Sequence, residues 1–187
     1  MSLLELIAVA DERALAAGAL ACLDRCLPPL GGAAEPEPLR PLWASCEDGR
    51  EWATRLTAAR TAQAGEDPAD GPAAPLRGLL AAAPSDFAAA PLREWADACS
   101  LAALEVHLRY DAYGDQEALR RCRTGEENGI GPLVAGELRR QTRILEILAE
   151  SAGTRGGGAG LRRALDLSTE GRRVLRAVMS RRARGQS

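Results

Sequence analysis

The sequence predicts an all-α protein, a helical bundle of about four main helices with short accessory helices and a C-terminal helical pair. Hydrophobic residues make up 46% of the 187 residues but aromatic residues only 3%. Alanine, the strongest helix former, supplies much of the apolar content. Apolar residues also recur at helical spacings, without the period-two alternation or the β-branched runs that are typical of strands.

The first predicted helix covers residues 2–27. Ser2 is suited to cap its N-terminus, and Glu5, three residues later, completes a capping box. Because apolar side chains surround nearly the whole segment, we expect this helix at the centre of the bundle. Cys22 and Cys26 lie one turn apart on it, and we interpret them as two small buried side chains.

The second predicted helix covers residues 41–64. Pro41 suits its first turn. Gly49 weakens its middle, so any break in this helix is expected at that residue. Connectors rich in proline and glycine, 28–41 and 65–75, precede and follow it.

The third main helix is predicted over residues 91–112, with short helices at 76–83 and 116–122 on either side. Its apolar residues form the cleanest stripe in the chain, at spacings of three and four. The stripe consists of Trp95, Cys99, Ala102, Val106, Tyr110 and Tyr113.

The fourth main helix is predicted over residues 132–151, starting at Pro132, a residue favoured at the first helical position. Its inward-facing residues are Val134, Leu138, Leu145 and Leu148. Two further helices are predicted at 161–167 and 169–184, with Ser168 as the N-cap between them. We therefore expect a bundle over 1–153 and a basic helical segment over 154–187, packed on the same domain.

Charge is unevenly distributed along the chain, whose formal net charge is −2. Residues 1–119 contain 9 arginines and 19 acidic residues, whereas residues 120–187 contain 15 arginines and 7 acidic residues. The two halves would attract each other within the fold or across a dimer interface; otherwise the basic half is available to an anionic partner. The candidate binding residues are Arg172, Arg173, Arg176, Arg181 and Arg182.

The leading functional hypothesis is a non-enzymatic helical protein that acts by binding another protein or a second copy of itself. The alternative is a nucleic-acid-binding protein that uses the C-terminal arginines. The stretch "ALDLSTEGRRVLRAV" resembles the turn and recognition helix of a helix-turn-helix motif, in which basic side chains contact phosphates and bases.

A third hypothesis places a small-molecule or enzymatic pocket near the single histidine. His107 and Asp111 are spaced so that the carboxylate would orient a general base. Trp95, Tyr110 and Tyr113 would line the pocket. No nucleophile can be named beside them, so the sequence leans against an enzyme.

The sequence gives no reason to expect a metal or a cofactor. One histidine cannot supply the repeated Glu-x-x-His pairs of a dinuclear carboxylate bundle, and the five cysteines form no CxxC knuckle. Neither a signal-peptide pattern nor a membrane span is recognisable. We therefore expect a cytoplasmic protein without a disulfide scaffold and with no membrane contact.

Overall fold

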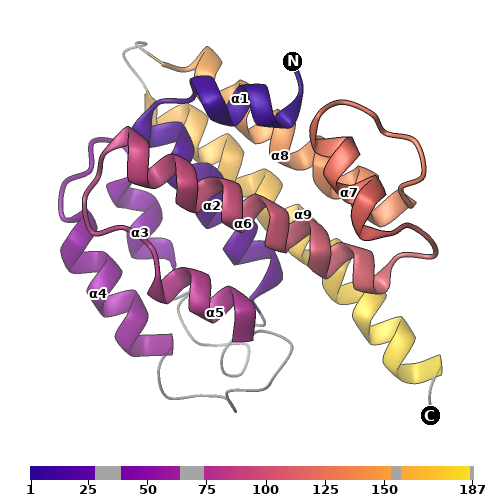
Figure 1. Ribbon diagram of the computed structural model, residues 1–187. Helices are drawn as coiled ribbons and strands as arrows, with labels where there is room; N and C mark the ends of the chain where they lie inside the picture. The colour runs from indigo at the N-terminus through magenta and orange to yellow at the C-terminus, as the bar shows by residue number, and fades with distance from the viewer. Residues whose placement is uncertain (28–38, 64–73, 153–156, 186–187) are drawn as a thin grey trace.

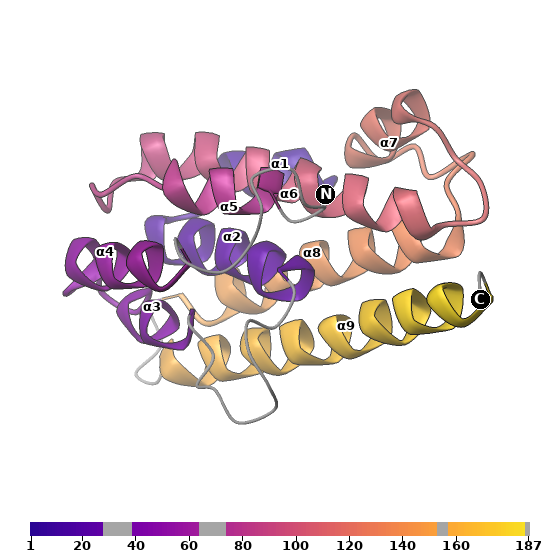
Figure 2. The ribbon, with the colours of Figure 1, turned by 90° about the horizontal axis from the view of Figure 1, so that it is seen from below.

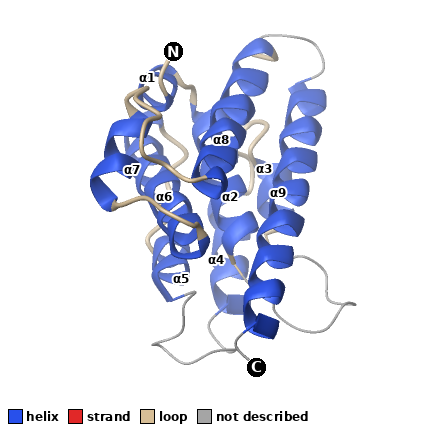
Figure 3. Ribbon diagram, turned by 90° about the vertical axis from the view of Figure 1, so that its right-hand side faces the viewer, coloured by secondary structure: helices blue, strands red, loops and turns tan. Residues whose placement is uncertain are grey.

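The computed structural model describes residues 1–27, 39–63, 74–152 and 157–185, and all regular secondary structure within them is helical (Figure 3). The predicted all-α class is therefore confirmed. The helices of these ranges are α1 Leu3–Val9, α2 Glu12–Cys26, α3 Arg40–Ser45, α4 Trp52–Gln63, α5 Ala74–Ala81, α6 Ala89–Tyr110, α7 Gln116–Arg123, α8 Pro132–Glu150 and α9 Gly157–Gly185.

Four long helices, α2, α6, α8 and α9, form the bundle, and α2 lies at its centre (Figure 1). Helix α2 packs against the other three, and 12 of its 15 residues are buried. Figure 2 shows α6 and α9 on opposite sides of α2 and α8. The all-round apolar character of this segment thus correctly predicted its central position.

The first predicted helix is divided in two, however. Helix α1 ends at Val9 and α2 begins at Glu12. The break occurs because the Asp11 carboxylate accepts a hydrogen bond from the backbone N–H of Ala14 at 2.8 Å and caps α2. The predicted capping box of Ser2 and Glu5 is present at the start of α1.

The second predicted helix is also divided, at the glycine that weakened it. Gly49 has φ 72° and lies in the turn between the end of α3 at Ser45 and the start of α4 at Trp52. A Cβ atom at this position would lie 2.6 Å from the ring of Phe87. Glycine is therefore required both by the backbone conformation and by the close approach of the ring.

The buried stripe of α6 is rotated relative to the predicted one. Trp95 and Cys99 are buried as expected, but Ala103 and His107 are buried in place of Ala102 and Val106. Helix α6 packs against α2 and α8, and its buried face combines Leu92 and Leu104 with small alanine, serine and cysteine side chains. The predicted stripe followed the aromatic residues, and it was therefore displaced by about one residue from the buried stripe.

Helix α8 begins at Pro132, as predicted, and buries Val134, Leu138, Leu145 and Leu148. The predicted C-terminal pair is wrong, because residues 161–184 belong to the single helix α9. Most of the connectors predicted at 28–41 and 65–75 lies outside the described residues. Within those residues, no helix combines the length and apolarity needed to cross a membrane.

Candidate functional site

The predicted basic segment forms the second half of α9. From residue 171 to the end of the chain there are six arginines and no acidic residue. Arginine favours helix formation, and positive charge near a helix C-terminus opposes the negative end of the helix dipole. The composition of this segment therefore explains how it remains helical with little packing around it.

Polar contacts with the end of α2 hold the middle of α9. The Ser168 hydroxyl donates to the Ala21 carbonyl at 3.2 Å and to Asp24 Oδ2 at 3.0 Å. Arg172 donates to Asp24 Oδ1 at 3.3 Å. Ser168 is therefore a buried mid-helix contact to α2, and its prediction as an N-cap between two helices is wrong.

Gly171 brings α9 especially close to two arginine side chains. A Cβ atom here would lie 2.5 Å from Arg25 Cδ and 2.9 Å from Arg140 Cδ. Gly171 lies within the stretch that resembles a helix-turn-helix motif, and it is a packing position within a continuous helix. Since there is no turn, the structure contradicts that resemblance.

The last turns of α9 extend past the C-terminal end of α6 (Figure 1). We call residues 176–185 the projecting end of α9. Each of them is exposed except Val178, which is half-buried. Helix α9 thus consists of a part packed on α2 and α8 and a part that extends into solvent.

The five candidate arginines occupy different environments. Arg172 is mostly buried and paired with Asp24. Arg182 is exposed; it donates to the Arg109 carbonyl at 2.6 Å, and its guanidinium carbon lies 5.9 Å from the centre of the Tyr110 ring. Arg173, Arg176 and Arg181 are exposed. These three candidates are therefore accessible to a partner.

The five residues predicted to line a pocket are spread along and beyond α6. Trp95 lies twelve residues before His107, about 18 Å along the helix. The Trp95 indole donates to the Leu79 carbonyl at 2.8 Å, near α5. Tyr110 lies beside Arg182, and Tyr113 is 61% exposed.

Asp111, the predicted partner of His107, instead caps α8. Its Oδ2 accepts a hydrogen bond from the backbone N–H of Val134 at 2.8 Å, and its Oδ1 accepts one from Ala112. A Cβ atom on Gly131 would lie 2.1 Å from Asp111 Oδ1, so the glycine makes room for this cap. Satisfying an N–H at the start of α8 is a structural role for the carboxylate.

A buried ion pair, which the sequence did not predict, lies between α2 and α8. Arg25 Nε donates to both carboxylate oxygens of Glu137, at 3.0 and 3.1 Å. Both side chains are fully buried. His107 Nδ1 lies 2.8 Å from the Ala103 carbonyl, and Nε2 lies 3.6 Å from Glu137 Oε2. The single histidine thus lies in the core beside this ion pair.

Hydrogen bonds extend this network to α6 and α7. Gln141 donates to Glu137 Oε1 at 2.9 Å, and its own Oε1 accepts from the Ser100 hydroxyl at 2.7 Å. Arg123 lies 3.4 Å from the same hydroxyl and pairs with Asp97. Polar residues at two positions of the apolar stripe of α8, Glu137 and Gln141, were the sequence signal for this network.

The network keeps its central groups charged. Burial by itself would raise the pKa of Glu137, but the charges of Arg25 and His107 and hydrogen bonds from Arg25 and Gln141 lower the pKa below its ordinary value. Burial likewise opposes the charged form of Arg25, and Glu137 reverses the effect, so the pKa of Arg25 is raised. The pair is enclosed by protein and has no access to substrate. We therefore assign it to holding the helices together.

We expect acid to destabilise the protein in part through Glu137. Its folded-state pKa is lowered, so its contribution to stability is fully present above the ordinary carboxyl pKa of about 4.5. That contribution is lost as the pH falls from there through the lowered value. Carbon NMR of the Glu137 carboxyl would measure the titration directly. A midpoint at or above 4.5 would contradict the structure.

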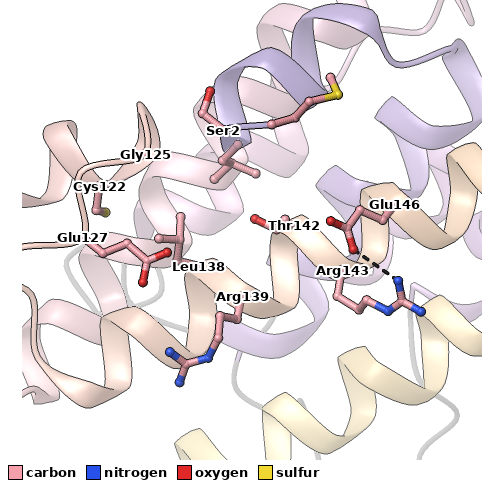
Figure 4. Close-up of a pocket in the computed structure, with 11 residues that line it drawn as sticks. Ser2, Cys122, Gly125, Glu127, Leu138, Arg139, Thr142, Arg143 and Glu146 are labelled. Carbon is pink, nitrogen blue, oxygen red and sulfur yellow. Dashed lines mark hydrogen bonds and ion pairs between the residues drawn. The ribbon is translucent and has the colours of Figure 1, made fainter.

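A surface pocket of about 370 Å³ lies beside the start of α1, the α7–α8 connection and α8 (Figure 4). Its buried apolar side chains are Leu3, Leu138 and Cys122. Arg143 at its rim already pairs with Glu146 at 3.2 Å. With both signs of charge around it, the pocket presents no concentrated charge to an ionic ligand.

Cysteine and metal chemistry find little support in the part of the chain that the structure describes. All five cysteines are free and buried, and burial raises the pKa of Cys22 to about 12, which suppresses thiolate reactivity. No group of three or more potential metal ligands occurs among these residues. No family model, curated protein or solved structure matches this chain.

Proposed function

We propose that this protein is a non-enzymatic interaction domain that binds an acidic protein through the projecting end of α9 together with Arg173, about one turn before it. The observation that carries the proposal is the exposure of Arg173, Arg176 and Arg181 on a helical segment without any acidic residue. The bundle supports this segment from one side only.

Electrostatics favour an anionic partner for this surface. The charge of Arg172 is already compensated by Asp24, whereas the exposed arginines of the projecting end lie on a segment with no carboxylate of its own. A concentrated field of one sign steers an oppositely charged partner and discriminates against like-charged ones. Two copies of this segment would repel each other, so the proposed partner is a different protein.

Exposed apolar side chains favour a protein over a nucleic acid. Val174 and Met179, each 37% exposed, lie among the arginines of α9. Methionine is a common contact residue at protein-binding surfaces because its side chain adapts to different partners. Phosphate contacts would need only the arginines and would leave these side chains without a role.

Charge removal at the proposed surface should weaken binding of an acidic polypeptide. We expect the triple variant R173Q/R176Q/R181Q to bind labelled polyglutamate about tenfold more weakly than the natural protein at low salt. The three side chains are exposed, so the helical content should remain unchanged. Fluorescence anisotropy measures the affinity, and circular dichroism checks the fold.

A matched variant, R139Q/R162Q/R163Q, removes the same charge from exposed positions elsewhere on α8 and α9. It should bind polyglutamate nearly as well as the natural protein. Equal losses in both variants would show that only net charge matters and would reject the assigned surface. Tighter binding of single- or double-stranded DNA through Arg173, Arg176 and Arg181 would replace the proposal with the nucleic-acid alternative.

A further inference from the structure

Resting on the proposed function, we infer that the acidic partner binds as an amphipathic helix along the bundle-facing side of the projecting end of α9. This side continues the stripe by which α9 packs on its own bundle. The inference depends on the spacing of that stripe, on what covers its first part and on the charges beside its second part.

The stripe runs along α9 at spacings of three and four residues, the pattern of a helix–helix contact. Its buried members are Leu161, Ala164, Ser168, Gly171 and Leu175. The same spacing continues to Val178, Met179 and Arg182. Leu175 is 2% exposed, whereas Met179, one turn later, is 37% exposed. The contact pattern of α9 therefore continues beyond the part that the bundle fully covers.

The covered part of the stripe indicates the kind of structure that fits the rest. Helices α2 and α8 pack against α9, and the end of α2 reaches Ser168 and Arg172. Side chains at this spacing form ridges and grooves that accept the side chains of another helix. A partner helix would continue the same packing over Val178 and Met179.

The charges beside the stripe indicate that the partner helix is acidic. Arg176 and Arg181 are exposed on the projecting end, one on each side of the stripe by helical periodicity. A helix with apolar residues on one face and glutamate or aspartate beside them would cover Met179 and place its carboxylates near these guanidinium groups. Such a surface recognises an amphipathic helix through the apolar side chains that the helix presents one turn apart.

Arg182 connects this surface to α6. It lies on the stripe, and its contacts with the Arg109 carbonyl and the Tyr110 ring join the projecting end to the last turn of α6. These contacts limit the movement of the projecting end away from the bundle. The stripe is therefore presented on a supported helix, which reduces the ordering required when a partner binds.

Two peptides of identical composition and charge test the inference. Both contain glutamate, alanine and leucine; in one the leucines form a helical stripe, and in the other they are scattered. We expect the striped peptide to bind the full-length protein about tenfold more tightly in fluorescence anisotropy. Met179→Gln should weaken binding of the striped peptide at least about threefold and leave the affinity for the scattered peptide nearly unchanged.

Val9→Gln is the control, because Val9 is 71% exposed on α1, away from this stripe. This control variant should bind both peptides with the affinity of the natural protein. Equal affinities for the two peptides, or a Met179→Gln variant that binds both normally, would overturn the helical partner and leave the proposed binding of acidic polypeptides intact. Failure of both peptides and of polyglutamate to bind would overturn the proposed function as well.

Discussion

Replacing Glu137 with glutamine is expected to lower the free energy of unfolding by about 3–5 kcal/mol, because it leaves the charge of Arg25 buried without its counter-ion. The shape of the side chain is nearly conserved, so the loss would report charge and not packing. The Arg25 and Glu137 side chains are both fully buried, and solvent cannot compensate for the missing charge. Urea unfolding followed by circular dichroism measures the change.

Two further variants make this prediction specific. Glu146→Gln removes a carboxylate from the partly exposed face of the same helix and should change stability little. Replacing both partners, as Arg25→Met with Glu137→Leu, should recover much of the stability lost in Glu137→Gln, because no unpaired charge remains in the pair. A Glu137→Gln protein as stable as the natural one would show that the pair does not hold the core as described.

Replacing Trp52 with alanine should destabilise the protein by a similar amount, about 3–5 kcal/mol, because it empties a large buried volume. Trp52 is 1% exposed and joins α4 to neighbouring elements. Its ring centre lies 5.4 Å from that of Phe87 and 6.0 Å from that of Trp95, in edge-to-face arrangements. Its indole N–H donates to the Pro84 carbonyl at 2.8 Å. Thermal and urea unfolding would measure the loss.

Trp52→Phe separates the volume of this side chain from its hydrogen bond. Phenylalanine keeps an aromatic ring in the site but leaves the Pro84 carbonyl without its donor, so we expect a smaller loss of about 1–2 kcal/mol. If the alanine and phenylalanine variants lost the same stability, the hydrogen bond would dominate and the packing argument for Trp52 would be wrong.

The helices were predictable where local and tertiary preferences agree. Pro132 at the start of α8 and the Ser2–Glu5 capping box of α1 act through neighbouring residues, and both occur in the structure. Asp11 also acts locally, as the cap of α2, but the apolar pattern around it concealed the break. Ser168 shows the opposite case, since a good N-cap residue lies inside a helix where it bonds to α2.

The candidate site was predictable only in part. The arginines of the C-terminal segment are visible in the sequence, and the structure divides them into Arg172, paired with α2, and an exposed group. Glu137 and Gln141 were visible as polar residues within an apolar stripe. Their connection to Arg25, 112 residues from Glu137 along the chain, was not, because it depends on how α2 and α8 pack.

The sequence alone determined that the chain is helical, that its first long apolar segment lies at the centre and that positive charge collects at its C-terminus, since composition and helical periodicity are local properties. Only the tertiary structure decided where helices break, which face of α6 is deepest, and which charges are buried in pairs. These depend on distances between segments remote in the sequence. Burial then sets the energetic consequence of each charge, through the loss of hydration and the presence or absence of a partner.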